Sequence, residues 1–425
     1  MRTFFLVLAL LVAAPVPALG QQPQAITLES AMASAVERHP SVVAAARALD
    51  AAQARLVQAR AGPGVQVSVG ANASVGTLGA TGTPTSTVGT SHDVAIGATM
   101  PLYDGGVSRQ QIVQAQAALD AAQAGLAAVR QDIALTAAEA YFEVLQAQRT
   151  VEVREAAVQS AQAQVRQAEA FFRAGTAAQA DVIRARAAAA RAEADLVTAR
   201  GQVETTLVSL RGAMALSLAQ PVSVVDPTPP VVPAVAAADA VAEATRQRPE
   251  VLRADADMRS AEAALRIAEI RAGPQVNVNA NAAVQVTPDP GSAGWSISAT
   301  VSHPLLDGGR SKAAVEEARA NALAAAARRE STVLQVQTQA HRAAVGVASA
   351  SARTEATRAS SAAAEESSRV SEGRYRAGVG TLVELLDAQS LATEARIGAV
   401  QALYDLHLAV VNLGHALGRP MSAQR

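Results

Sequence analysis

The residues of this sequence that are best placed to act together chemically are two carboxylates, Glu384 and Asp387. They lie three positions apart, so in a helix they share one face and their charges project together. A paired acidic face that borders a water-filled pore attracts cations. The same spacing is equally typical of an ordinary solvated helix face, and the pair alone does not decide between the two interpretations.

No constellation for catalysis, metal binding or cofactor binding accompanies this pair. The sequence has 0 cysteines, which excludes disulfides, thiolate nucleophiles and cysteine-ligated metals. None of its six histidines (39, 92, 303, 341, 407 and 415) has a carboxylate or a second histidine at ligand spacing. The two Asp-Gly-Gly segments, at 104–106 and 307–309, do not have the spacing of a phosphate-binding loop. We therefore expect no enzyme, no cofactor and no metal site.

The composition and the first residues indicate an exported protein. Of the residues 50% are hydrophobic but only 2% are aromatic, and the formal net charge is −1. No strongly basic surface for nucleic acid is expected from this charge. Residues 1–20 have the charge, the apolar run and the small residues of a signal peptide, with cleavage before Gln21.

The rest of the chain is an internal duplication. PLYDGG at 101–106 returns as PLLDGG at 304–309, and FRAG at 172–175 returns as YRAG at 375–378, in both cases 203 positions later. A constant shift over this length indicates doubling of a large unit rather than a short-period repeat. The chain divides into a first repeat at 21–220, a proline-rich linker at 221–236 and a second repeat at 237–425.

Each repeat is expected to contain a helix, a β-hairpin and a long helical hairpin. Proline is absent between 107 and 172 and between 310 and 376, which predicts helices of roughly 100 Å at about 1.5 Å per residue. Asp104 and Asp307 lie where an N-cap is needed. The helical hairpins are predicted at about 105–214, with a tip near 175, and at about 308–418, with a tip near 378.

A seam of apolar residues with heptad spacing runs along the first long helix. It shifts by four residues between Ala140 and Val144, a stutter that locally unwinds a supercoil. Its members are Ile112, Leu119, Leu126, Ile133, Ala140, Val144, Val151, Val158, Val165 and Phe172.

Two β-hairpins are predicted, at about 65–101 and about 276–304. Apolar and polar residues alternate in the first strand of each over about eleven positions, enough for a tilted strand that crosses a membrane. The polar faces are expected to be uncharged, as a wet lumen tolerates. The lumen candidates are Gln66, Asn72, Asn277, Asn279 and Asn281. Alternation alone leaves a soluble sheet as an equal alternative.

Four strands in one chain cannot close a barrel, because small closed barrels need about eight. An open sheet in lipid would leave the backbone groups of its edge strands without hydrogen bonds, at several kcal/mol for each group. Three symmetric copies would supply twelve strands. The sequence therefore favours an oligomer if the sheet lies in a membrane.

The run YRAGVGTLVELLDAQ at 375–389 adds the most specific motif to this pattern. With the twin PL(Y/L)DGG and RAG segments, it makes the sequence resemble the TolC-like outer membrane efflux protein family from residue 26 to residue 419. The resemblance implies a mainly α protein with a membrane β-barrel: a homotrimer whose twelve-stranded barrel, four strands per protomer, continues into a long α-helical barrel. It also implies a passive exit duct in the Gram-negative outer membrane that extends into the periplasm. Such a duct would receive substrates from a periplasmic adaptor and an inner-membrane transporter of the RND or ABC type.

The resemblance further implies roles for individual residues. It maps a selectivity ring onto Glu384 and Asp387, and gate-locking contacts onto Asp181 and Tyr375. The family's arginine partner in the gate falls on Gly380 here, which leaves two alternatives: Arg376 or Arg184 substitutes for it, or the gate is looser. The closed tip, which also docks the adaptor, maps onto Arg173, Gly175, Arg376 and Gly378. A glycine after a helix is also the ordinary residue of a left-handed helix end, and this interpretation stays open.

A periplasmic coiled-coil scaffold or adaptor-like protein without a pore is the alternative function. The alternating strands of valine and asparagine speak against it. The exported substrate, whether a drug, a metal ion or a protein, leaves no signature, because a passive duct carries little substrate chemistry of its own.

Overall fold

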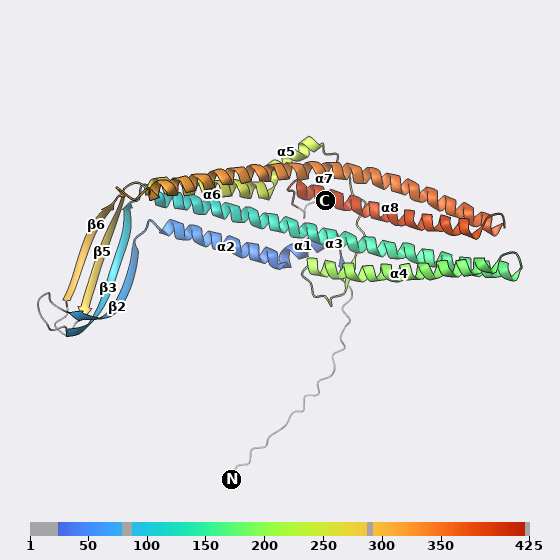
Figure 1. Ribbon diagram of the computed structural model, residues 1–425, viewed down its shortest axis with the longest axis horizontal. Helices are drawn as coiled ribbons and strands as arrows, with labels where there is room; N and C mark the ends of the chain where they lie inside the picture. Colours follow the sequence, from blue (N-terminus) through green and yellow to red (C-terminus); the bar gives the residue numbers. More distant parts are fainter. Residues whose placement is uncertain (1–23, 79–86, 287–291, 421–425) are drawn as a thin grey trace, which may run out of the picture.

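The computed structural model describes residues 24–78, 87–286 and 292–420, and the predicted signal peptide at 1–20 lies outside them. The molecule is elongated. A four-stranded sheet lies at one end, and the two turns that each connect a long helix to the next helix lie at the other (Figure 1). Long helices run between the two ends, so the predicted lumen residues and the predicted tip residues lie at opposite ends of the protein.

The two halves of the chain build the same series of elements. The first half contains β1 (Gln24–Ile26), α1 (Leu28–Arg38), α2 (Pro40–Ala61), β2 (Gln66–Leu78), β3 (Thr87–Tyr103), α3 (Val107–Arg173) and α4 (Gln179–Ala213). The second half contains β4 (Val222–Val224), α5 (Ala237–Gln247), α6 (Pro249–Arg271), β5 (Gln275–Val286), β6 (Ser292–Ser302), α7 (Arg310–Arg376) and α8 (Leu382–Ala416). The helices α3 and α7 have 67 residues each, so each is about 100 Å long.

The helices form one layer that is four helices wide along its whole length. In the half near the sheet, α2 packs on α3, α3 on α6 and α6 on α7. In the half near the tip, α4 replaces α2 and α8 replaces α6 as neighbours of the two long helices. The helix α3 is therefore covered on each of two sides by two shorter helices placed end to end, and α7 is covered in this way on one side.

Small side chains make this packing close. More than half of the buried residues of α3 are alanine, which lets the backbones of neighbouring helices approach. The predicted seam is buried at Leu119, Leu126, Ala140, Val144 and Val158. It ends in solvent, since Phe172 is 45% exposed at the tip.

Aspartates start both long helices, two positions earlier than a standard N-cap residue. The helix boundary itself falls on Gly106 and Gly309, which have left-handed backbone conformations. Asp104 accepts hydrogen bonds from the N–H groups of Gly106 (2.8 Å) and Ser108 (2.7 Å), and Asp307 binds Gly309 and Ser311 in the same way. Burial alone would raise the pKa of Asp104, but its hydrogen bonds with Ser108 and Gly106 outweigh burial and hold the pKa below its ordinary value.

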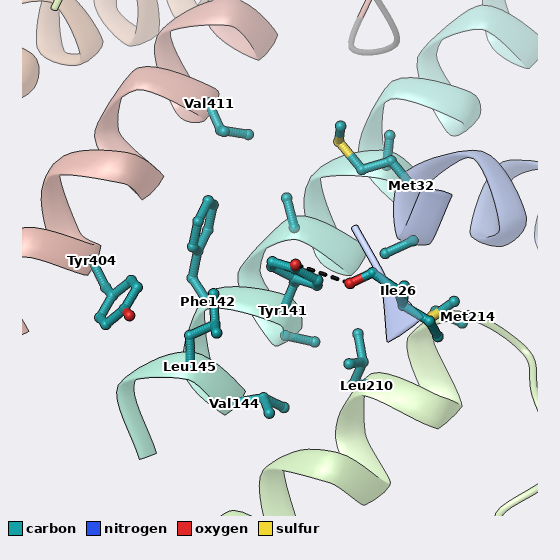
Figure 2. Packing of buried hydrophobic residues seen from close by; sticks show 14 residues of the cluster. Ile26, Met32, Tyr141, Phe142, Val144, Leu145, Leu210, Met214, Tyr404 and Val411 are labelled. Carbon is teal, nitrogen blue, oxygen red and sulfur yellow. Dashed lines mark hydrogen bonds between the residues drawn. The ribbon is translucent and has the colours of Figure 1, made fainter. Parts of the chain in front are cut away.

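The main hydrophobic core lies at mid-length, where the short helices meet end to end. It joins Ile26 of β1, Met32 of α1, Leu210 of α4 and Val411 of α8 to a run of α3 residues around Tyr141 (Figure 2). Phe142 on the same turn packs edge-on against Tyr141, with ring centroids 5.9 Å apart. This core ties both repeats to one segment of α3.

The Tyr141 hydroxyl closes a small parallel sheet over this core. β1 pairs with β4, and the Val225 N–H donates to the Ile26 carbonyl at 3.1 Å. The Tyr141 oxygen lies 3.1 Å from the same Ile26 carbonyl and also reaches the carbonyl of Val225. Burial raises the pKa of Tyr141 to about 12, so the hydroxyl keeps its proton at neutral pH and acts as a donor.

The four strands at the far end form an antiparallel sheet in the order β2-β3-β5-β6. The central pair, β3 and β5, joins the two repeats. The register slips between Pro101 and Tyr103, as expected at a proline, which has no N–H for the strand ladder. In the chain described here β2 and β6 each have one unpaired edge.

One helix among the described residues, α8, is long and apolar enough by length and composition to cross a membrane. Tyr404, Leu406 and Leu413 of this helix are instead buried in contacts with neighbouring helices. Packing within the chain thus buries part of its apolar surface, 39% of the most apolar window.

The turns before the two long helices provide a matched test of packing. An added methyl at Gly105 would lie 2.7 Å from Cγ2 of Ile270, whereas one at Gly308 meets nothing within 4 Å. Both glycines have nearly the same φ, +65° and +64°, so both substitutions by alanine share a backbone cost of about 1–2 kcal/mol. We predict that Gly105→Ala lowers the free energy of unfolding by roughly 1–3 kcal/mol more than Gly308→Ala.

Denaturant unfolding followed by far-ultraviolet circular dichroism measures this difference. Adding Ile270→Ala to Gly105→Ala is expected to remove most of the excess loss. Equal losses for the two glycine variants would show that α6 does not approach the Gly105 turn as described.

Candidate functional site

The two tip turns are built alike and are set by the backbone. Gly175 follows α3 and Gly378 follows α7, with φ of +75° and +74°. The N–H of Thr176 donates to the Phe171 carbonyl and that of Val379 to the Arg374 carbonyl, both at 3.0 Å. This pattern is the Schellman ending of a helix, in which glycine takes the left-handed position. The ordinary structural interpretation of both glycines is therefore sufficient to explain their presence.

A second hydrophobic core holds the two tips together. Tyr375 of α7 is 6% exposed, and its ring packs against Phe171 of α3 with centroids 5.5 Å apart. Around this contact lie Ala168, Val182, Ala185, Leu382 and Leu385. The tip of one repeat is thereby fixed against the tip of the other within a single chain.

Glu384 and Asp387 lie on the exposed face of α8, directly after this core. Leu382 and Leu385 are buried on the opposite side, which orients both carboxylates outward. Glu384 also closes a capping box: its N–H donates to Thr381 Oγ1 at 3.2 Å, and its carboxylate accepts from the Thr381 N–H at 3.4 Å. Glu384 thus has a structural role at the start of α8 in addition to its charge.

The repeat symmetry exposes a difference in charge between the two tips. Asp181 and Arg184 occupy the positions that correspond to Glu384 and Asp387, again 203 residues apart. In the first repeat, Arg184 lies 3.4 Å from Asp181 and neutralises it. In the second repeat both positions are acidic. The first helical hairpin is locally neutral at this level, and the second carries two negative charges.

Of the two arginines expected to substitute for the missing gate partner, Arg184 is the one that contacts Asp181. Arg376 pairs with Glu372 one helical turn away on α7. Gly380 itself has little space, because an added Cβ would lie 3.0 Å from Cβ of Arg374. The ion pair at Asp181 is therefore made within one hairpin, by Arg184.

Tyr375 and Asp181 lie near each other without a hydrogen bond. Burial raises the pKa of Tyr375, and the charge of Asp181 adds to the rise. Among the described residues, the hydroxyl of Tyr375 is buried and has no hydrogen-bond partner. Of the remaining tip residues, Arg173 is exposed and donates a hydrogen bond to the backbone carbonyl of Glu169 in its own helix.

The predicted lumen residues lie on one face of the sheet, in rows that cross the strands. In the strand register Gln66 of β2 lies opposite Thr99 of β3, and Thr99 lies opposite Asn279 of β5. The Thr99 hydroxyl donates a hydrogen bond to the Asn279 amide oxygen at 3.2 Å. Asn281 and Asn277 occupy neighbouring rows on the same face. The polar side chains thus gather on a single surface, opposite the valines.

The expectation that this face is uncharged is wrong at Asp93. The strand β3 begins earlier than the sequence pattern indicated and includes this residue. The register aligns Asp93 with Asn72 on β2 and with Gln285 on β5. Within the described strands of this sheet, Asp93 is the one acidic residue. Extending the alternation backwards from Val94 would have revealed it.

No group of three metal-ligating side chains occurs in the part of the chain that the structure describes, and two of the histidines have structural contacts there. His407 is buried and stacks on Phe142 and Tyr404, and burial lowers its pKa. His415 meets Asp132 at 2.9 Å, a pair 283 positions apart that local spacing does not predict. Both histidines serve the packing of α8 on α3.

A profile of the family described as "Outer membrane efflux protein" matches residues 31–216 and 240–419, and the chain belongs to this family. The protein is accordingly an efflux channel of the Gram-negative outer membrane that extends into the periplasm, and its family is one of passive channels.

Individual relatives agree with this assignment. Nodulation protein T of Rhizobium leguminosarum bv. trifolii is 25% identical over 336 residues, covering 75% of this chain and 70% of the relative. Outer membrane protein OprJ of Pseudomonas aeruginosa is 28% identical over 184 residues, 41% of this chain and 38% of OprJ. The crystal structure of VceC from Vibrio cholerae superposes with a TM-score of 0.82 at 22% identity, over 93% of this chain and 96% of that one. That likeness shows the shared fold.

Two buried tyrosines give a test of the tip geometry. Tyr375→Phe removes a buried hydroxyl that has no partner, so we predict a free energy of unfolding that is unchanged or higher by about 1 kcal/mol. Tyr141→Phe removes a hydroxyl bound to backbone carbonyls and is expected to cost about 1–2 kcal/mol. Denaturant titration of both variants checks the contrast. A loss at Tyr375 as large as that at Tyr141 would require a partner for the Tyr375 hydroxyl outside these contacts.

Proposed function

We propose that three copies of this chain form the outer-membrane exit duct of a tripartite export system. The open four-stranded sheet carries the proposal, because each chain has an apolar face, a polar face and two unpaired edges. In lipid those edges must be paired, and three copies would close twelve strands with the polar face inward. The helices of the three copies would continue this lumen into the periplasm as an α-helical barrel.

The tips would form the periplasmic gate and the docking surface for the adaptor. Arg173, Gly175, Arg376 and Gly378 lie at the end most distant from the sheet, where a partner that crosses the periplasm would meet the duct. An inner-membrane transporter of the RND or ABC type would supply the energy, because no nucleotide or cofactor site is expected in this chain. Docking and gating at these residues stay predictions.

Membrane fractionation and planar-bilayer recording test the duct itself. The purified protein is expected to be a trimer in detergent and to insert into a bilayer as a stable channel. Recovery from the periplasm as a soluble monomer without channel activity would overturn the proposal in favour of a scaffold or adaptor-like role.

The acidic face of α8 is expected to make the closed end of the duct prefer cations. Threefold symmetry would place six carboxylates from Glu384 and Asp387 around one pore. We predict that Glu384→Gln with Asp387→Asn moves the reversal potential in a potassium chloride gradient towards zero. Glutamine at this position retains the capping box, so α8 keeps its start.

The charge-conserving variant Glu384→Asp with Asp387→Glu serves as the control and should keep the cation preference of the unaltered protein. An unchanged reversal potential in the uncharged variant would remove both carboxylates from the permeation path.

Asp93 is expected to act as a second, independent determinant of ion selectivity. It lies on the polar face of the sheet, while Glu384 lies at the opposite end of helices about 100 Å long. At physiological salt, charges this far apart are screened from each other. We predict that Asp93→Asn also lowers cation preference, and that its effect adds to that of the double variant at the tip.

Bilayer recordings of the single, double and triple variants measure additivity, with Asp50→Asn on the exposed surface of α2 as the charge-matched control. If Asp93→Asn behaves like this control, Asp93 does not face the conducting lumen.

A further inference from the structure

A hollow of about 380 Å³ lies where the helices meet the sheet. It is bordered by the start of α3, the end of α6 and the start of α7, three neighbouring helices of the layer. Figure 1 shows α6 and α7 converging there on the strands. The site is far from both tips and shares no residue with the proposed gate or with the proposed lumen.

The lining of this hollow combines positive charge with an apolar floor. The positive charges are those of Arg271, the last residue of α6, and Arg310, the first residue of α7. Amides and a hydroxyl add further donors, and the floor consists of small aliphatic groups around the buried Ile267. The polar members other than the arginines are Gln111, Gln114 and Ser311.

No negative charge of the described chain balances the two arginines. The lining contains no carboxylate, and neither Arg271 nor Arg310 forms an ion pair or side-chain hydrogen bond within the described residues. The nearest acidic residues along the chain are Glu269 and Asp307. Glu269 is exposed and lies outside the lining, and Asp307 already accepts hydrogen bonds from the N–H groups of Gly309 and Ser311. The guanidinium groups are therefore free to bind an external anion.

The first repeat reproduces only one of the two arginines: Arg60, at the end of α2, corresponds to Arg271. The residue that corresponds to Arg310 is Val107, which is 203 positions earlier and is buried. The two junctions between sheet and helices thus differ, although their backbones follow the same plan. Repetition of the fold alone does not account for the arginine pair.

We propose that this hollow binds a phosphate-bearing anion, with Arg271 and Arg310 holding the phosphate oxygens. Planar guanidinium groups form paired hydrogen bonds with such oxygens, and a phosphate between two of them matches both charge and geometry. The apolar floor favours a ligand that carries an aliphatic part beside its phosphate. Such a phosphate belongs to an anionic lipid headgroup or to a free phosphate ion, and the two sources are separable by experiment.

Isothermal titration of the detergent-purified full-length protein separates the sources. The probes are dihexanoyl phosphatidylglycerol below its micellar concentration, dihexanoyl phosphatidylcholine and inorganic phosphate. Arg271→Ala with Arg310→Ala is expected to weaken binding at least tenfold. The matched control, Arg266→Ala with Lys312→Ala, removes two positive charges from the same two helices outside the hollow and should bind like the unaltered protein.

A variant that retains both arginines distinguishes loss of binding from loss of folding. Ala268→Phe fills the hollow and should abolish binding, while the helical circular dichroism of every variant stays that of the unaltered protein. Binding of phosphatidylglycerol alone assigns the site to a lipid headgroup, and binding of inorganic phosphate as well assigns it to the phosphate group itself. The proposal fails if no probe binds, if the double arginine variant binds normally, or if the control loses binding equally.

Discussion

The whole structure depends on keeping a single helix of 67 residues covered from end to end. A helix of this length does not hold its place through local hydrogen bonds, since most helical stability in proteins comes from packing an apolar face. Shorter helices cover α3 on two sides: α2 followed by α4 on one side, and α6 followed by α8 on the other. Its alanine-rich surface lets all four approach, and through them it sets the distance between the sheet and the tips.

The weak place in such an arrangement is the level at which one short helix ends and the next begins. Backbone groups at helix ends need partners, and the apolar face of α3 would otherwise be uncovered there. The core around Tyr141 fills this level, and the parallel pair of β1 and β4 lies over it. Asp226, just after β4, accepts hydrogen bonds from Tyr404 of α8 at 3.0 Å and from Arg149 of α3 at 2.5 Å. These bonds connect the segment after β4 to both helices. The largest core therefore lies where continuity of the helices is lost.

Much of this arrangement can be predicted from the sequence, because it follows from the periodicity of apolar residues and from the internal duplication. The proline-free stretches, the alternating strands and the glycines after the long helices each correspond to an element in the structure. Pairings between distant residues are a different matter. The bond of Tyr141 to Ile26, the pair of His415 with Asp132 and the seating of Tyr375 on Phe171 join segments whose local patterns carry no sign of one another. Arg184 could be named as a partner of Asp181 beforehand, but only geometry separates it from Arg376.

The parallel pairing of β1 with β4 also dictates an order of assembly. Gln24 is aligned with Val222, so β1 has no partner in this sheet until the rest of the first repeat and the start of the linker have been synthesised. Contacts between residues so far apart in sequence form late, because the loop between them must first be closed. The pairing of β1 with β4 therefore depends on a chain segment that follows both α3 and α4 in the sequence. The core at mid-length is likewise complete only when α8 of the second repeat is in place, because Tyr404 and Val411 belong to it.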